Sequence, residues 1–165
     1  MIYVNPKLNF FAKFYNFFLK IGSNLQSIFL FFMRVTWGHQ FFLAGVAKLQ
    51  NIDHAKEFFS AMGIFWPEMS AYLVSYFEII GGICLMIGFA SRIITIPLII
   101  IILTALGTAH SYLLKNVIFI LDPHSFAQDL PFPYFITAML VFCFGPGRLS
   151  LDAWIKRWVE KQPRY

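Results

Sequence analysis

Four ionisable side chains interrupt or border the long apolar runs of this sequence: Arg34, His39, Glu78 and His110. An ionisable group inside a hydrocarbon layer costs at least about 2.5–3.5 kcal/mol, so such residues pair with one another or serve a function. Carboxyl, imidazole and guanidinium groups in a sheltered pocket can exchange a proton or bind a polar headgroup. These residue types therefore indicate proton handling or the binding of a quinone headgroup.

Two narrow helix faces combine these charges with glycines. At about 100° per residue, the faces hold Arg34, Gly38, Gly45 and Lys48 on one, and Glu78, Gly81, Gly82 and Gly88 on the other. Membrane helices approach most closely through small residues. We therefore predict that the two helices pack through their glycines and that Arg34 or His39 neutralises Glu78. Arg34 shares the glycine face, whereas His39 matches the depth of Glu78 better.

Two interpretations of this polar cluster remain open. In the first, the pair is only a lock between two helices. In the second, Arg34, His39 and Glu78 line a pocket that opens outward past His110 and binds a proton or a quinone. His110 by itself is ordinary for a helix end at a membrane interface. No metal or haem site is expected, because the two histidines lie at different depths and no C-x-x-C-H motif is present.

The elements that must position these residues are apolar segments long enough to cross a membrane. A bilayer core of about 30 Å needs roughly 20 residues of helix. Four segments approach this length, at about 28–49, 71–90, 93–113 and 130–144. The composition agrees, because 59% of residues are hydrophobic and 13% are charged, whereas soluble domains are about half apolar and about a quarter charged. We predict an all-α membrane protein whose residues 25–148 form an antiparallel bundle of four transmembrane helices.

The distribution of basic residues predicts the orientation of this bundle. With both termini in the cytoplasm, the inner side receives Lys7, Lys13, Lys20, Arg92, Arg148, Lys156, Arg157, Lys161 and Arg164. The outer side then receives only Lys48, Lys56 and Lys115. Because cytoplasmic loops of membrane proteins are enriched in Lys and Arg, we expect the N-terminus and the C-terminus to be cytoplasmic. The same distribution explains the net charge of +5 without nucleic acid as a partner.

Two flanking segments are predicted to be amphipathic helices on the inner membrane surface. Residues 1–24 place Lys13, Asn16 and Lys20 opposite phenylalanines, and we expect Gly22 to Asn24 to break this helix. Residues 149–165 begin with Ser150 as a candidate N-cap and continue with an apolar stripe that contains two tryptophans. The conformation of residues 114–128 is left open.

The sequence resembles the DoxX family over about residues 30–153. The resemblance is carried by Arg34-Val-Thr-Trp-Gly38, by Phe77-Glu78-Ile-Ile-Gly81-Gly82 with Gly88 and Arg92, by His110, and by Gly145-Pro146-Gly147-Arg148-Leu149-Ser150-Leu151-Asp152. It implies a small four-helix protein of the bacterial inner membrane. It also implies a link to redox work, because relatives include the membrane subunit of a thiosulfate:quinone oxidoreductase and a partner of superoxide dismutase and a sulfurtransferase.

Physical roles can be predicted for the motif at the cytoplasmic face, which comprises Arg92, Gly145, Gly147, Arg148, Ser150 and Asp152. Gly145 and Gly147 end the fourth helix, and Arg148 is suited to lipid phosphate. We expect Asp152 to pair with Arg148 or with Arg92.

The function classes that remain are few. The sequence contains no P-loop, dinucleotide fingerprint, nucleophile elbow or zincin motif, so we expect no enzymatic activity from this chain alone. We predict a membrane subunit or anchor of a quinone-linked or thiol-linked redox complex. Its expected partners are the lipid bilayer and a soluble or membrane redox protein, and it can also form an oligomer. The alternatives are a noncatalytic scaffold for a soluble partner and, as an oligomer, a small-solute transporter.

Overall fold

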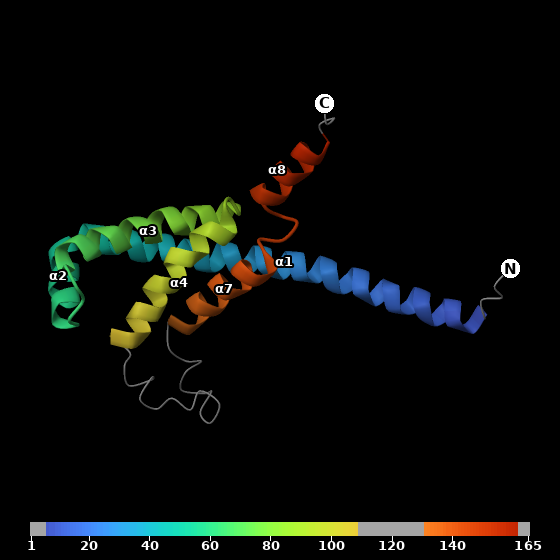
Figure 1. Ribbon diagram of the computed structural model, residues 1–165, viewed down its shortest axis with the longest axis horizontal. Coiled ribbons are helices and arrows are strands. Elements are labelled where there is room, and N and C mark those ends of the chain that lie inside the picture. Colours follow the sequence, from blue (N-terminus) through green and yellow to red (C-terminus); the bar gives the residue numbers. More distant parts are fainter. Residues whose placement is uncertain (1–5, 109–130, 162–165) are drawn as a thin grey trace, which may run out of the picture.

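The described part of the chain is entirely helical. The computed structural model describes residues 6–108 and 131–161, with side chains from residue 13 onward. These ranges contain six helices and no strand: α1 (Pro6–Gln50), α2 (Ile52–Ala61), α3 (Pro67–Ile87), α4 (Ser91–Thr108), α7 (Pro131–Phe144) and α8 (Leu151–Glu160) (Figure 1). Helices α3 and α4 are long and apolar enough to cross a membrane, with mean hydropathies of 1.7 and 2.0, and α7 is apolar but has 14 residues. The predicted all-α class is therefore confirmed.

Helix α1 is a single helix of 45 residues, about 68 Å long (Figure 1). The break expected at Gly22 to Asn24 is wrong, because the helix continues through these residues. Ser23 and Ser27 donate their hydroxyls to carbonyls of the same helix, Lys20 O at 3.0 Å and Ser23 O at 3.2 Å. One internal glycine costs a helix only about 1 kcal/mol, which neighbouring good helix formers offset. The position of the first half of α1 on the membrane surface stays a prediction.

The second half of α1 lies beside α3 in antiparallel orientation (Figure 1). A Cβ atom added to Gly82 would lie 2.5 Å from the Gly38 carbonyl oxygen, and one added to Gly45 would lie 2.6 Å from the Ser75 carbonyl oxygen. The two backbones are therefore in direct contact at these glycines. Gly81 faces away from α1, because its nearest neighbour is the Leu98 side chain of α4, 2.9 Å from the position of an added Cβ.

The buried core joins four helices. It consists of Phe41 from α1, Leu85 from α3, Leu98, Ile102 and Leu106 from α4, and Ala138 and Val141 from α7. A smaller cluster of Ala55, Phe59 and Ala71 holds α2 against the start of α3. Helix α2 lies in the stretch between the first two predicted spans, for which the sequence analysis predicted no helix. With 10 residues, α2 is too short to cross a membrane as a helix.

Replacement of Gly82 by alanine is expected to destabilise the bundle. The added methyl group meets backbone atoms of Gly38 and Phe42, which cannot move away without separating α1 from α3. We expect a loss of about 1–3 kcal/mol in the free energy of unfolding, measured by thermal or denaturant unfolding in detergent. Gly22→Ala is the matched control, because nothing lies within 4 Å of its added Cβ. Equal effects of the two substitutions would contradict the close α1–α3 contact.

Candidate functional site

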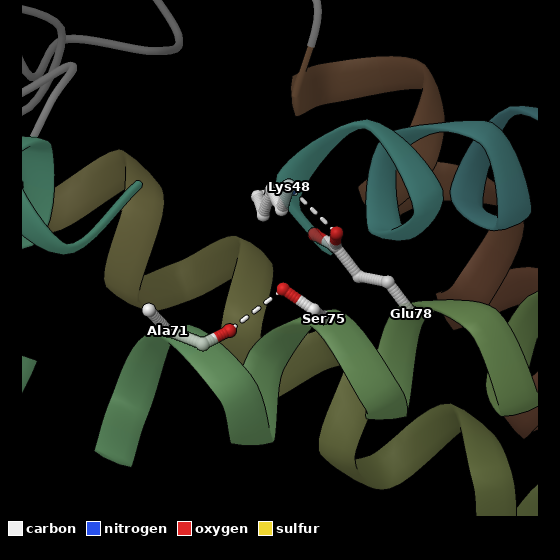
Figure 2. Close-up of polar contacts among 4 residues, drawn as sticks. All are labelled: Lys48, Ala71, Ser75 and Glu78. Atoms are coloured by element: carbon white, nitrogen blue, oxygen red, sulfur yellow. Dashed lines mark hydrogen bonds and ion pairs between the residues drawn. The ribbon is translucent and has the colours of Figure 1, made fainter. Parts of the chain in front are cut away.

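A buried ion pair joins the end of α1 to the middle of α3. The Lys48 ammonium donates a hydrogen bond to Glu78 Oε2 at 2.5 Å. Only 8% of the Glu78 side chain and 28% of the Lys48 side chain are exposed. Figure 2 shows the two side chains pointing toward each other across the gap between α1 and α3, one helical turn from Ser75. The Ser75 hydroxyl is occupied within its own helix, where it donates to Ala71 O at 2.7 Å.

The expectation that Arg34 or His39 neutralises Glu78 is wrong. The glycine contacts bring Glu78 roughly level with Ala44 and place Arg34 about 15 Å further along the bundle. Because each side chain in a helix leans toward the N-terminus of its own helix, Lys48 and Glu78 lean toward each other in this antiparallel pair. Arg34 leans the opposite way. His39 is exposed on another side of α1, and His110 lies outside the described residues.

Glu78 lies at the junction of two mostly apolar cavities. The larger, of about 320 Å³, lies between α2, α3 and α4, and its wall includes Lys48, Phe59, Leu73, Ile101 and Thr104. We call it the α3–α4 cavity. The smaller, of about 150 Å³, is here called the α7 cavity, and its wall includes Phe41 and Tyr134. Glu78, Ile101 and Ala105 line both cavities. The carboxyl group is thus the one acidic group that faces both spaces among the described residues.

Aromatic rings form one wall of the α7 cavity. The Tyr134 ring packs edge-on against Phe41, with centroids 4.7 Å apart, and against Trp37, with centroids 5.0 Å apart. Offset and edge-on aromatic pairs of this kind hold one another in fixed orientations. Tyr134 was not among the residues predicted for the site, because nothing in the sequence pattern around Pro131 places it next to Glu78.

Lys48 reaches both the interior and the surface. Besides the α3–α4 cavity, it lines an open surface cavity of about 430 Å³ between the end of α1 and α2, together with Asn51 and His54. Lys48 therefore connects the pair to the surface cavity, and Glu78 connects it to the two interior cavities. Chemically, the arrangement suits proton exchange with a small and mostly apolar ligand. The described residues do not gather three side chains that could hold a metal ion.

A second polar cluster lies at the opposite end of the bundle, around the start of α8. The two Asp152 carboxylate oxygens accept hydrogen bonds from the backbone amides of Ala90, at 2.8 Å, and Ser91, at 2.9 Å. These amides open α4, so Asp152 caps a helix of another segment. The expected pairing of Asp152 with Arg148 or Arg92 is wrong. Ser150 is the N-cap of α8 and accepts from the Ala153 amide at 3.2 Å, which is the role that the sequence predicts for it.

Arg34 belongs to this second cluster. Its guanidinium is fully buried and donates to Leu85 O at 3.3 Å and to Leu149 O at 2.6 Å. It lies against Gly88, which ends α3 with a left-handed φ of +72° and leaves no room for a Cβ beside the guanidinium. The Arg34 side chain therefore joins α1 to the end of α3 and to the segment before α8. Gly88 accordingly serves this joint and not the α1–α3 glycine contact.

The comparison with known proteins now identifies the family. The family model described as DoxX matches residues 29–111, from the middle of α1 to the end of α4. This chain belongs to the DoxX family. The match contains Arg34, Lys48 and Glu78, whereas Tyr134 and Asp152 lie beyond it. Together with the apolar helices, membership of DoxX indicates a membrane protein.

One curated relative extends the similarity over most of the chain. A Bacillus subtilis (strain 168) protein named "Putative oxidoreductase CatD" is 32% identical over 123 residues, which cover 74% of this chain and 84% of that protein. No solved structure matches this DoxX chain.

Removal of one partner of the Lys48–Glu78 pair is expected to cost more stability than removal of both. Lys48→Met leaves a buried carboxylate without its counter-ion, and we expect the free energy of unfolding to fall by up to about 3 kcal/mol. This value is at the lower end for buried ion pairs because Lys48 is partly exposed. The double variant Lys48→Met with Glu78→Gln should regain part of this loss. A double-mutant cycle of unfolding in detergent measures the coupling. Lys56→Met, which breaks a pair with the exposed Asp53, is the control and should cost less than about 1 kcal/mol. Strictly additive effects at Lys48 and Glu78 would speak against the pair.

Substitution of Asp152 is expected to loosen α8. Asp152→Ala removes the acceptors of two amides at the start of α4, and each unsatisfied buried donor costs about 1–3 kcal/mol. Asp152→Asn keeps one acceptor oxygen and should have a smaller effect. Limited proteolysis of the C-terminal segment in inverted membrane vesicles measures the change. Glu160→Ala is the control, because Glu160 forms only an exposed ion pair of 3.9 Å with Lys156. Unchanged cleavage in Asp152→Ala would show that the cap does not hold α8.

Proposed function

We propose that this DoxX protein is a four-span membrane subunit of a redox complex and that the two cavities at Glu78 receive a lipid-soluble redox carrier of the quinone class. The observation that carries this proposal is the Lys48–Glu78 pair, a pair of proton-carrying groups placed where two mostly apolar cavities meet. The redox element comes from the family and from the relative that is named an oxidoreductase.

The four spans in this proposal are the second half of α1, α3, α4 and α7. Helices α3 and α4 meet the length and hydropathy of a span by themselves. The other two pack on them, α1 on α3 and α7 on α4. All four helices carry large apolar side chains on the outer surface of the bundle, such as Phe32 of α1, Ile83 of α3, Ile100 of α4 and Phe142 of α7. Such a continuous apolar exterior suits lipid and not water.

We place the bundle in the bacterial cytoplasmic membrane with both ends of the chain inside. The start of α4, the end of α7 and all of α8 lie at the same end of the bundle, and α2 lies at the other (Figure 1). The first of these ends carries Arg92, Arg148 and Arg157, which favours the cytoplasmic side for it. The Glu78 cavities then open in the outer half of the membrane.

The lining of the cavities fits a quinone ring. A volume of about 320 Å³ is within the range of small-ligand pockets, and the walls offer isoleucine, leucine and phenylalanine side chains. The pair of Lys48 and Glu78 supplies one donor and one acceptor for carbonyl or hydroxyl oxygens. Tyr134 and Phe41 supply aromatic surface in the α7 cavity, and Trp37 packs against Tyr134.

A division of labour follows from this arrangement. Reduction of a quinone to a quinol takes up electrons and protons in equal number, and the reverse reaction releases them. The partner redox protein exchanges the electrons in our proposal. Glu78 exchanges protons with the cavities, and Lys48 passes them to or from the surface cavity that contains His54.

A noncatalytic scaffold is the second candidate. It is favoured by α8, which has no buried residue and projects from the bundle (Figure 1). On this alternative the Lys48–Glu78 pair is only a lock between helices, and α8 recruits a soluble partner.

Quinone content separates the two candidates. We expect the full-length protein, extracted gently from its native membrane, to retain quinone, and Glu78→Gln to reduce the amount per mole of protein at least about fivefold through the lost charged contact. Solvent extraction and mass spectrometry measure it. Glu57→Gln, an exposed carboxyl group on α2, is the matched control and should behave as the wild type.

Two outcomes would overturn the quinone proposal. One is wild-type protein that is folded and free of quinone. The other is equal quinone content in wild type and Glu78→Gln. Either result favours the scaffold.

A further inference from the structure

A groove of about 530 Å³ lies at the α8 end of the bundle, on the side opposite to the Glu78 cavities. It runs between α1, the end of α7, the segment after α7, and α8. Three basic side chains from three different elements line it: Arg92 of α4, Arg148 of the segment before α8, and Lys156 of α8. Helices far apart in the sequence thus bring positive charge to one concave surface.

These charges are left largely uncompensated by the groove itself. Its one acidic lining residue among those described is Asp152, whose two oxygens already accept from the Ala90 and Ser91 amides. The Arg92 side chain forms no hydrogen bond or ion pair with the described residues. Lys156 has only the exposed partner Glu160, at 3.9 Å. The groove therefore presents a net positive charge to an incoming anion.

Polar contacts hold Arg148 in place, and Arg92 lies beside the backbone of Gly145. Arg148 donates to Asn24 Oδ1 of α1 at 2.9 Å, and its carbonyl accepts from Arg157 at 2.8 Å. Gly145, with a left-handed φ of +79°, lies under the Arg92 guanidinium, 3.5 Å from the position of an added Cβ. Arg148 is thus held in one position and loses little conformational entropy when an anion binds.

The groove is also partly apolar. Phe144 of α7 lines it and is 62% exposed, whereas Leu30 of α1, which also lines it, is only 3% exposed. The groove lies where α4 begins and α7 ends, which is the level of the lipid headgroups if these helices cross the membrane. An anion with an attached apolar chain can contact both the basic and the apolar side chains of the groove, whereas a free inorganic anion can contact only the basic ones.

We propose that this groove is a binding site for the phosphate headgroup of an anionic phospholipid, with its acyl chains along Phe144. Arg92, Arg148 and Lys156 surround the phosphate. The bound lipid connects α1, α7 and α8 and holds α8 at the membrane surface. The site is separate from the Glu78 cavities, so it does not depend on the quinone proposal.

The test uses full-length protein purified in a neutral detergent, with mixed micelles of phosphatidylglycerol, of phosphatidylcholine, or with inorganic phosphate alone. Native mass spectrometry and the thermal unfolding midpoint report binding. We expect phosphatidylglycerol to bind and to raise the midpoint, and the Arg92→Gln, Arg148→Gln double variant to bind it about 10–30-fold more weakly. The Lys20→Gln, Lys161→Gln double variant loses the same charge outside the groove and should bind as the wild type.

A second variant guards against misfolding. Arg92→Lys with Arg148→Lys keeps the charge and should retain most of the binding, since a phosphate accepts ammonium donors as well. Three outcomes would overturn the proposal: equal binding of the two phospholipids, equal loss in the control double variant, or protection by inorganic phosphate alone to the same extent.

Discussion

The direct backbone contact between α1 and α3 fixes where the charged groups of this bundle can meet. Because Gly38 lies on Gly82 and Gly45 lies on Ser75, the register of the two antiparallel helices is set without any help from charge. In that register, only a long side chain near the end of α1 can lean toward Glu78, and Lys48 is that side chain. The ion pair is therefore a consequence of the glycine contact and not its cause.

The two buried charged centres of the bundle solve the same problem in different ways. Arg34 is fully buried, and its two terminal nitrogens donate to the carbonyls of Leu85 and Leu149, which joins three chain segments, while its Nε has no partner among the described residues. Glu78 instead faces a side chain that remains partly exposed, and it borders two cavities. A charge held by backbone carbonyls has no space around it for a ligand. A charge at a cavity wall does, which is why the candidate site lies at Glu78.

The family match covers the part of the chain that contains both buried charged side chains, Arg34 and Glu78. It ends at residue 111 and so contains the α1–α3 contact, Arg34 and the Lys48–Glu78 pair. The aromatic wall from α7 and the Asp152 cap lie beyond it. The part of the chain that matches the family thus holds the glycine contact and both buried charged side chains, whereas α7 and α8 add the second wall of one cavity and, together with Arg92 of the matched part, the basic groove.

The sequence by itself determined the helical class, the three glycines of the α1–α3 contact (Gly38, Gly45 and Gly82) and the small set of charges that need partners, because these follow from composition and from a period of 3.6 residues. It also assigned Gly81 and Gly88 to this contact, where they do not lie. Lys48 was even on the same helical face as Arg34, yet its place near a predicted helix end assigned it to the outer loop. Only the tertiary structure decided which charges meet. Pairing depends on the register between two helices and on the direction in which their side chains lean. The pattern of residues along one helix specifies neither of these. The same holds for Asp152, whose partners are backbone amides of α4, because a backbone amide has no sequence signature.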